Sequence, residues 1–431
     1  MADARPPVAG APGGCCTDDP TLRGVEDLLA DVLGDLAATV PVAVAPSADP
    51  AGVLGLVLAE DVRATAPLPG FDNAAMDGYA VDHRDVADAT PDAPVTLPVV
   101  GAVAAGSGGA PPRVARGRAV RIMTGARMPP GATAVVPWES TDRGSARVEV
   151  HHGVDEGRHV RRTGEDVACG DLVVAAGTTL RARHLGVLAA LDVRTVRVHP
   201  APRVAVVATG SELQPAGEPL RPDGIRDSGA TLVGASVVEA GGVVVATRTV
   251  PDDPAALEQA LAEVAPLADL VVTTGGVSEG DHDVVRLTLA GRGSMWFGRI
   301  AMQPGKPQGF GRLEAGGPLL CCLPGNPVAS FTSFHVLVRP ALARLRGASV
   351  AWPTSSAVLA TDLDSPADRL QLVRATLEHG DDLPRVTPGG TASHMVGALA
   401  RSDVLVVVPV GVTRLSAGAT VTVLRIDPEP L

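Results

Sequence analysis

The sequence predicts a multidomain α/β and β protein whose central feature is a doubly wound parallel sheet. Residues 202–347 alternate continuous apolar strands with helical segments, as in sheets that helices cover on both faces. Residues 95–155 and 350–431 contain short β-like runs separated by Gly and Pro, which indicates two further β domains. The chain of 431 residues is long enough for roughly two to four domains.

The elements expected before residue 202 are mixed. Residues 1–21 are rich in Pro, Ala, Gly and Asp, and we expect a disordered tail there. Residues 22–38 have helical periodicity. Beyond the β-like runs, residues 157–200 are expected to form a polar loop, a short strand at 172–175 and a helix at about 181–191.

The α/β domain begins with the apolar strand RVAVVAT (203–209), which Gly210 follows. Further strands are expected at 242–249, 270–274, 295–300 and 319–323. Helices are expected at 229–240, 254–265, 283–290 and 326–346. From residue 350 the helical pattern disappears, and the apolar runs predict a C-terminal β barrel or sandwich.

Charge and composition argue against several classes of protein. A net charge of -12 disfavours a general nucleic-acid binder, which would carry a basic face. No apolar run approaches the roughly 18 residues of a membrane span. The five cysteines are odd in number and lack zinc-site spacing, so we expect reduced thiols in a cytoplasmic protein. Cys321 and Cys322 lie in a Leu-rich strand and are interpreted as core residues.

Lys306 is the only lysine, in the segment Pro304-Gly305-Lys306-Pro307, although the chain has 36 Lys and Arg residues. Lys is a compact point charge and Arg a planar fork, so a lysine kept against this bias suggests that Arg fails there. The alternative is survival by chance. Asn73, Asn326 and Tyr79 are similarly scarce and also lie in segments punctuated by Gly and Pro.

Three Gly-rich turns are expected at one edge of the parallel sheet, namely TGSEL (209–213), TTGGVSEGDHD (273–283) and LPGNP (323–327). Ligands of such sheets bind beyond the carboxyl ends of the strands, and glycine N–H groups can cradle phosphate. The turns therefore predict a phosphate-bearing ligand, although such turns also follow strands for steric reasons alone. PGKP is not a Walker A loop, because Pro307 follows the lysine instead of Ser or Thr.

Four carboxylates lie on or beside these turns: Glu212, Asp252, Asp281 and Asp283. Each could instead be a helix N-cap or a solvated loop carboxylate. Carboxylates beside a phosphate are unfavourable unless a cation lies between them, so the pattern predicts Mg²⁺. In the polar loop VRRTGEDV, Asp166 is a further candidate, with a surface turn held by local ion pairs as the alternative. His394 is interpreted as an ordinary histidine.

Seven stretches occur together and in order: PLPGFDNAAMDGYAVD (67–82), GRAVRIMTGARMPPGATAVV (117–136), VRRTGEDV (160–167), PRVAVVATGSEL (202–213), DLVVTTGGVSEGDHD (269–283), AMQPGKPQGFG (301–311) and LPGNPV (323–328). Together they resemble the MoeA family of molybdenum insertases and the E domain of gephyrin, from about residue 22 to the C-terminus. FDNAAMDGYAV is the most specific of them, and the match includes Lys306, Asn73, Asn326 and Tyr79.

The resemblance implies four domains and a homodimer. These are an elongated linker domain (22–46 plus 157–200), an inserted β domain (47–156), a MogA-like α/β molybdopterin-binding domain (201–347) and a C-terminal β-barrel domain (348–431). Each active site would lie between the α/β domain of one subunit and the β domain of the other.

The function implied by the resemblance is insertion of molybdate into adenylylated molybdopterin, with Mg²⁺-dependent release of AMP. Asp77 would be the essential carboxylate of the β domain, and Asp252 and Asp283 the carboxylates on the Mg²⁺ and phosphate side. Lys306, Arg374 and Ser393 would hold molybdate, a cationic and polar cluster suited to an oxyanion. Glu212 and Asp166 would be further catalytic positions. The expected substrate contacts are Thr124, Gly210, Gly275, Gly276, Ser278, Pro324, Gly325, Asn326, Pro327, Arg374 and Ser393.

Three positions depart from the family pattern. Gln303 stands where many members have Lys, Ala329 stands where they have Ser, and Gly229 replaces the Asn of an Asp-Ser-Asn triplet. Two alternatives to the molybdate enzyme follow: a non-catalytic scaffold like gephyrin, and a tungstate-specific paralogue. Expected partners are the pterin substrate, the molybdopterin adenylyltransferase and cofactor-accepting apoenzymes, with no nucleic acid and no membrane.

Overall fold

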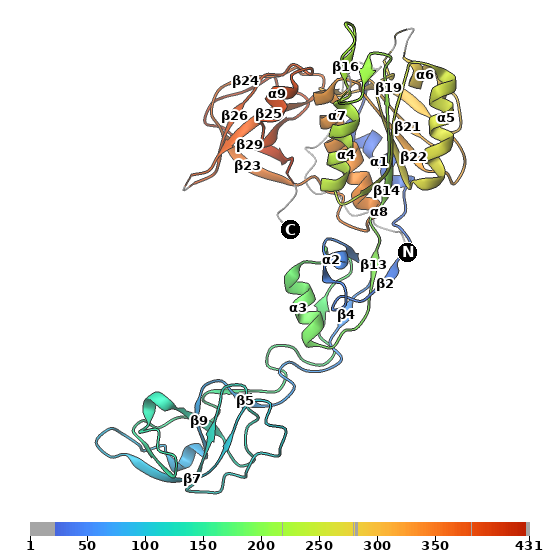
Figure 1. The fold of residues 1–431 in the computed structure, drawn as a ribbon. Helices are drawn as coiled ribbons and strands as arrows, with labels where there is room; N and C mark the ends of the chain where they lie inside the picture. The colour runs from blue at the N-terminus through green and yellow to red at the C-terminus, as the bar shows by residue number, and fades with distance from the viewer. Residues whose placement is uncertain (1–21, 218, 279, 281–282, 381, 428–431) are drawn as a thin grey trace, which may run out of the picture.

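The computed structural model of the chain describes residues 22–217, 219–278, 280, 283–380 and 382–427. The expected disordered tail and Asp281 lie outside these residues. The described chain is elongated (Figure 1): an α/β part and a C-terminal barrel lie at one end, and a β domain lies at the other. Between them lies a small part that contains helix α3 (Ala182–Ala190).

The α/β part is built on a seven-stranded sheet. In spatial order its strands are β1 (Leu22–Arg23), β19 (Trp296–Ile300), β21 (Gln308–Gly311), β22 (Leu319–Leu323), β18 (Leu270–Thr274), β14 (Arg203–Thr209) and β17 (Val243–Val250). The pairings from β22 through β18 and β14 to β17 are parallel, as predicted. Strand β21 was not predicted, and it runs antiparallel to both β19 and β22. The prediction of a parallel sheet is therefore wrong for β21, which lies between β19 and β22.

Helices cover both faces of this sheet, which makes the domain doubly wound. On one face lie α1 (Val25–Gly34), α4 (Gly229–Glu239) and α8 (Arg339–Leu345), and on the other α5 (Pro254–Val264) and α6 (Val284–Leu289). Val204, Val206 and Ala208 of β14 point to the first core and Ala205 and Val207 to the second. This alternation explains why every residue of β14 from Val204 to Ala208 is apolar.

The helix expected at 326–346 is interrupted. It consists of α7 (Pro327–Ser333), a π-helical turn (Phe334–Val338) and α8. Pro340 has no N–H to donate to the carbonyl of Val336, four residues earlier. The indole Nε1 of Trp352 donates to that carbonyl instead, at 3.2 Å.

The C-terminal part is a closed five-stranded barrel, which decides between the barrel and sandwich interpretations in favour of the barrel. Around the ring, its strands are β25 (Leu370–Glu378), β26 (Arg385–Pro388), β23 (Thr354–Leu359), β29 (Thr420–Arg425) and β27 (Val404–Val408), which pairs with β25. The two-residue strand β20 (Met302–Gln303) joins the outside of the ring at β25. The chain just before Lys306 is thereby fixed to the barrel. Short elements outside the ring are β24 (Leu363–Asp364), β28 (Arg414–Leu415) and the one-turn helix α9 (Val396–Leu399).

The β domain and the small central part each have their own β-sheets. The β domain contains the sheet β10 (Arg147–Val150), β7 (Val95–Val103), β8 (Ala119–Ile122), β6 (Gly78–Val81) and β9 (Ala134–Pro137). The central part packs α3 and α2 (Pro50–Val53) with the strands β2 (Val42–Val44), β3 (Val57–Leu58), β4 (Val62–Arg63), β12 (Leu172–Val174) and β13 (Val196–His199). Strand β5 (Asn73–Ala74) pairs with β11 (Val160–Arg161), and β15 (Leu213–Gln214) with β16 (Ile225–Arg226).

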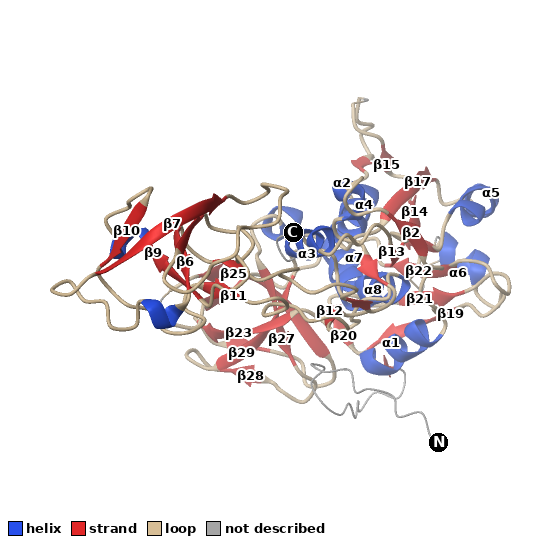
Figure 2. Ribbon diagram, turned by 90° about the horizontal axis from the view of Figure 1, so that it is seen from below, coloured by secondary structure: helices blue, strands red, loops and turns tan. Residues whose placement is uncertain are grey.

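Helices are concentrated in the α/β and central parts, whereas the β domain and the barrel are largely strand and loop (Figure 2). Within the described part of the chain, no helix combines the length and the apolar character that crossing a membrane requires. Cys321 and Cys322 of β22 are buried free thiols, as expected of core residues. Burial raises the pKa of Cys322 to about 12, so that its thiol stays protonated.

Candidate functional site

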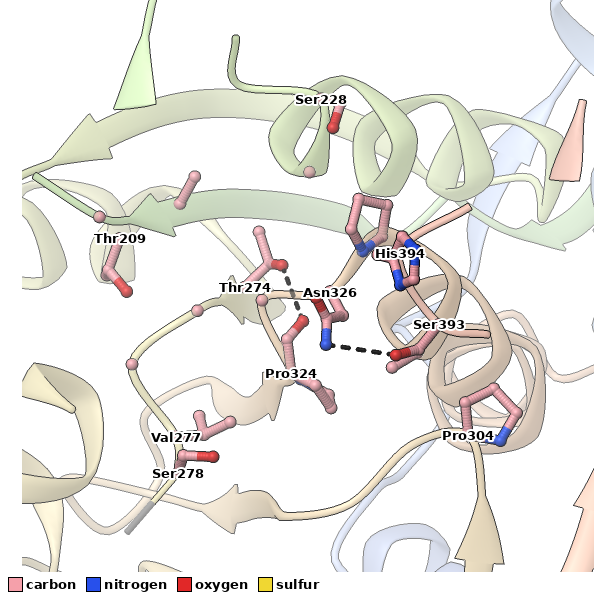
Figure 3. A pocket seen from close by; sticks show the side chains of 18 of the residues that line it. Thr209, Ser228, Thr274, Val277, Ser278, Pro304, Pro324, Asn326, Ser393 and His394 are labelled. Atoms are coloured by element: carbon pink, nitrogen blue, oxygen red, sulfur yellow. Dashed lines mark hydrogen bonds between the residues drawn. The ribbon is translucent and has the colours of Figure 1, made fainter. Parts of the chain in front are cut away.

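A cavity of about 890 Å³ opens at the carboxyl ends of β14, β17, β18 and β22, beside the barrel (Figure 3). The three Gly-rich turns form its strand-end side, and residues of 303–307 and 391–396 form the opposite side. The predicted site residues that line it are Gly210, Glu212, Asp252, Gly275, Gly276, Ser278, Asp283, Lys306, Pro324, Gly325, Asn326, Pro327 and Ser393. The fold therefore gathers residues that are up to 183 positions apart, from Gly210 to Ser393, around one space.

Four predicted site residues are not among those that line this cavity. Asp77 and Thr124 belong to the β domain, which the central part separates from the cavity within one chain (Figure 1). Asp166 is exposed in the polar loop, and its N–H donates to the carbonyl of Leu68. Arg374 lies in β25 and is described below.

The glycines of the second turn allow close approach of the backbone. Gly275 has a φ of +99°, and a Cβ there would lie 2.4 Å from the carbonyl oxygen of Thr209. Gly276 has a φ of +65°, and its Cβ would lie 2.9 Å from the Thr209 hydroxyl. Only glycine fits this conformation and this space. A ligand can thus come within hydrogen-bonding distance of the turn.

Two carboxylates fix the turns that carry them. Asp283 Oδ1 accepts the Ser278 N–H at 2.9 Å, and its Oδ2 accepts the Gly280 N–H at 2.8 Å. The side chain of Asp283 does not cap α6, so the N-cap interpretation fails for this residue. Asp252 Oδ2 accepts the Ser211 N–H at 2.9 Å, and Ser211 Oγ accepts the Asp252 N–H at 3.0 Å.

These carboxylates suit a metal that phosphate helps to bind. Each ionised carboxylate has about four lone-pair sites, so the bonds above leave some of them available. Among the described residues, no group of three or more His, Cys, Asp and Glu side chains is close enough to hold a metal by itself. Mg²⁺ is commonly bound by one or two carboxylates together with substrate phosphates, which matches this arrangement.

Lys306 stands in a loop that buried side chains hold in place. Gln308 Nε2 donates to the Ser333 hydroxyl of α7 at 2.6 Å and also to the carbonyl of Gly305. Gly305 has a φ of +131°, and a Cβ there would lie 2.8 Å from Ser333 Oγ. The half-buried Lys306 is therefore presented to the cavity from a backbone with little room to move.

Arg374 has different contacts from those predicted. Its guanidinium is buried, and it donates to the carbonyls of Met395 at 2.7 Å, Gly390 at 2.6 Å and Ala392 at 3.0 Å. Burial also lowers the pKa of Arg374. In this structure Arg374 positions the turn that carries Ser393. The hydroxyl of Ser393 in turn accepts a hydrogen bond from Asn326 Nδ2 at 3.3 Å (Figure 3).

All three departures from the family pattern line the cavity: Gln303, Ala329 and Gly229. Ser330, the residue after Ala329, is fully buried, and its hydroxyl lies 3.3 Å from that of Thr274. The Ser330 hydroxyl thus contacts Thr274 in the buried core beneath the turns. It does not replace a hydroxyl at position 329.

Three titratable side chains among the described lining residues were not predicted as site residues: Asp227, Arg226 and His394. Asp227 Oδ1 accepts the Ala230 N–H of α4 at 2.9 Å, and its Oδ2 accepts the Thr249 hydroxyl at 2.7 Å. The sequence signal was an aspartate just before a helical segment, which indicates a cap and does not reveal a cavity. His394 lies beside Asn326 at the barrel side of the site (Figure 3).

In the β domain, Asp77 and Thr124 are in contact. Asp77 Oδ1 accepts the Thr124 N–H at 2.7 Å and the Thr124 hydroxyl at 2.8 Å. The backbone hydrogen bond, followed by the side-chain one, lowers the pKa of Asp77. The β domain thus presents an ionised carboxylate beside an exposed threonine.

Models of three known domain families match most of the chain. They are the MoeA N-terminal region (domain I and II) at residues 24–191, the probable molybdopterin binding domain at 205–344 and the MoeA C-terminal region (domain IV) at 356–426. Together they cover the β domain, the central part, the α/β part and the barrel.

Individual relatives match over nearly their whole length. The chain is 43% identical to molybdopterin molybdenumtransferase 2 of Mycobacterium tuberculosis, over 86% of this chain and 92% of the relative. It is 36% identical to molybdopterin molybdenumtransferase 1 of the same organism, over 93% and 98%. A crystal structure of the molybdopterin biosynthesis moeA protein from Pyrococcus horikoshii superposes with a TM-score of 0.79 at 26% identity, over 94% of this chain and 100% of that one.

Proposed function

The chain belongs to the MoeA family, and on that premise we propose that it is a molybdopterin molybdenumtransferase, which completes the molybdenum cofactor. In detail, we propose that it inserts molybdate into adenylylated molybdopterin and releases AMP. The observation that carries the proposal is the two-sided cavity, with carboxylates and glycine turns on one side and Lys306 and Ser393 on the other. A molecule with a phosphoanhydride at one end and an oxyanion-accepting group at the other fits such a site.

The strand-end side is proposed to hold the phosphates. The backbone N–H groups of the Gly275 turn can approach phosphate oxygens, while Asp252 and Asp283 keep their turns in shape. Bound Mg²⁺ would supply charge neutralisation between these carboxylates and the phosphates. Glu212 lines the same side and adds to the negative charge that makes a cation necessary.

The barrel side is proposed to hold molybdate. Lys306 offers an ammonium and Ser393 a hydroxyl, both suited to an oxyanion. Gln303 and Ala329 line the cavity as well, and they supply neither a charge nor a hydroxyl. The cationic attraction that this loop contributes to the oxyanion therefore rests on Lys306.

Asp77 is proposed to reach the cavity of a second subunit. Within one chain the β domain and the cavity lie at opposite ends (Figure 1), so an essential Asp77 would have to act in trans. A symmetric homodimer would place two such β domains against two cavities. Thr124 would keep the Asp77 carboxylate ionised, ready to accept a proton from water that attacks the phosphoanhydride.

The decisive assay is AMP release by the purified protein, incubated with adenylylated molybdopterin and Mg²⁺. We expect AMP release to depend on the oxyanion and to be accompanied by active cofactor. Tight pterin binding without AMP release would contradict the enzyme and favour a gephyrin-like scaffold. Faster turnover with tungstate than with molybdate would favour the tungstate-specific alternative.

We also propose that the protein acts in the cytoplasm. Its proposed partners are the molybdopterin adenylyltransferase and the apoenzymes that accept the cofactor.

The Thr124 contact predicts a pH effect. Hydrogen bonds from Thr124 lower the pKa of Asp77. Asp77 therefore stays ionised at a lower pH than a carboxylate without these bonds would. Thr124→Val removes one of the two bonds, so the acid limb of kcat/KM against pH should move to higher pH. Thr96→Val, an exposed change in the same domain, is the control and should leave the profile unchanged. An unmoved acid limb in Thr124→Val would contradict a role for ionised Asp77.

A further inference from the structure

A second cavity, of about 680 Å³, lies where the central part meets the α/β part. Its walls come mainly from the segment 54–56 of the central part, the end of α4 with the turn after it (238–242) and the segment 335–353. None of the described residues that line it belongs to the candidate site. A volume of this size is typical of small-molecule sites.

The charge of this second cavity is opposite to that of the chain. Arg181, Arg339 and Arg346 line it together with His335, and Glu239 is the single carboxylate among the described lining residues. Glu239 is exposed. In a chain of net charge -12, such a basic concave surface attracts anions locally.

Two N–H groups of Arg346 donate to backbone carbonyls. Its NH1 donates to the carbonyl of Ala240 at 2.9 Å and its NH2 to that of Gly55 at 2.6 Å. A guanidinium has five N–H donors, so these two bonds do not exhaust it. Both partners are neutral carbonyls, which do not compensate the positive charge. Burial lowers the pKa of Arg346, and the nearby positive charge of Arg181 lowers it further.

His335 provides a second, independent sign of a ligand. It is 2% exposed, and its Nδ1 lies 3.4 Å from Arg339 NH1. Because a guanidinium can only donate, Nδ1 is the acceptor and Nε2 carries the proton. Nε2 is buried, with no hydrogen-bond partner among the described residues. His335 also lies in the π-helical turn, a feature that is frequent at functional sites.

We propose that this second cavity binds a small molecule through an oxyanion group, either a phosphate or a carboxylate. Arg346 supplies the charge that holds the oxyanion, and His335 lies in the same wall with an Nε2–H for which the described residues provide no acceptor. The bound anion relieves the repulsion between Arg181 and Arg346. The anion also holds the Arg346 guanidinium, which joins Gly55 of the central part to Ala240 at the end of α4.

The test uses the full chain with inorganic phosphate and succinate as separate probes. Hydrogen exchange followed by mass spectrometry locates the protection, and calorimetry measures the affinity. We expect at least one probe to protect peptides from 238–242 and 346–353. Protection confined to 270–278 and 324–327 would place the anion in the first cavity and overturn the proposal. The probe that binds more tightly tells phosphate from carboxylate.

A matched pair of variants tests the charge at the rim. Ser349 is exposed and lines the cavity, so substitution there leaves the core intact. Ser349→Glu should weaken probe binding at least threefold by repulsion, while Ser349→Gln should bind as the parent does. Arg346→Gln should weaken it about tenfold, the usual effect of losing a charged hydrogen bond. Equal affinity in Ser349→Glu and Ser349→Gln would overturn the proposal even if Arg346→Gln failed to fold.

Discussion

Replacing Lys306 by Arg is expected to lower oxyanion-dependent AMP release by about a hundredfold, although the charge is kept. The loop around Lys306 is fixed by Gln308, Ser333 and the tight position of Gly305, so the backbone cannot retreat to make room. A planar guanidinium is larger than an ammonium and presents its donors as a fork. It would therefore occupy space that the proposed oxyanion needs.

Two further variants separate size from charge. Lys306→Gln removes the charge and should lose activity at least as far as Lys306→Arg. Arg299→Lys makes the reverse exchange on an exposed residue of β19 and should keep normal turnover. Near-normal activity of Lys306→Arg would mean that the only lysine of the chain is an accident of descent.

Replacing Asp77 by Asn is expected to remove at least a hundredfold of the AMP-release rate, the usual contribution of a general base. The amide keeps the shape of the side chain but cannot accept the proton. The hydrogen bonds from Thr124 show that Asp77 is held as a carboxylate. Binding of the pterin should change little, because the cavity residues are in another part of the chain.

Asp88→Asn is the control for this change, since Asp88 is an exposed carboxylate of the same domain. It should retain full turnover. The measurement is single-turnover AMP release at saturating pterin, which separates chemistry from binding. If Asp77→Asn weakened pterin binding and left the single-turnover rate intact, Asp77 would contribute to substrate binding and would not act as the general base.

Most of the α/β fold could be predicted from the sequence, because its strands are buried on both faces and are therefore mostly apolar. Strands such as β18 and β14 are mostly apolar, and their bounds were predicted to the residue. Strand β21 was missed because it reads Gln-Gly-Phe-Gly, a run with little β propensity. Its hydrogen-bonding partners, β19 and β22, are visible only in three dimensions. The π-helical turn was also missed, and the Trp352 indole that donates to its Val336 carbonyl lies outside the helical segment.

The candidate site was predictable where chemistry lies on the strand-end turns, as for Gly275 and Asp283. The contacts of a side chain were harder to predict where that side chain has several possible hydrogen-bonding partners. Arg374 was expected to bind an anion, yet its guanidinium turns to three backbone carbonyls. Asp227 was not predicted because its position before α4 suggests only a helix cap. Partner choice of this kind follows from packing, which the sequence does not display.

The central claim is that one active site combines the cavity of one subunit with Asp77 of the other. The most direct test mixes Asp77→Asn and Lys306→Gln proteins, each inactive alone, under conditions in which subunits exchange. A mixed dimer would contain one site with both residues intact and one site with neither. Random exchange should therefore restore about a quarter of the parental AMP-release activity. No recovery, in a mixture shown to contain mixed dimers, would contradict a site shared between subunits.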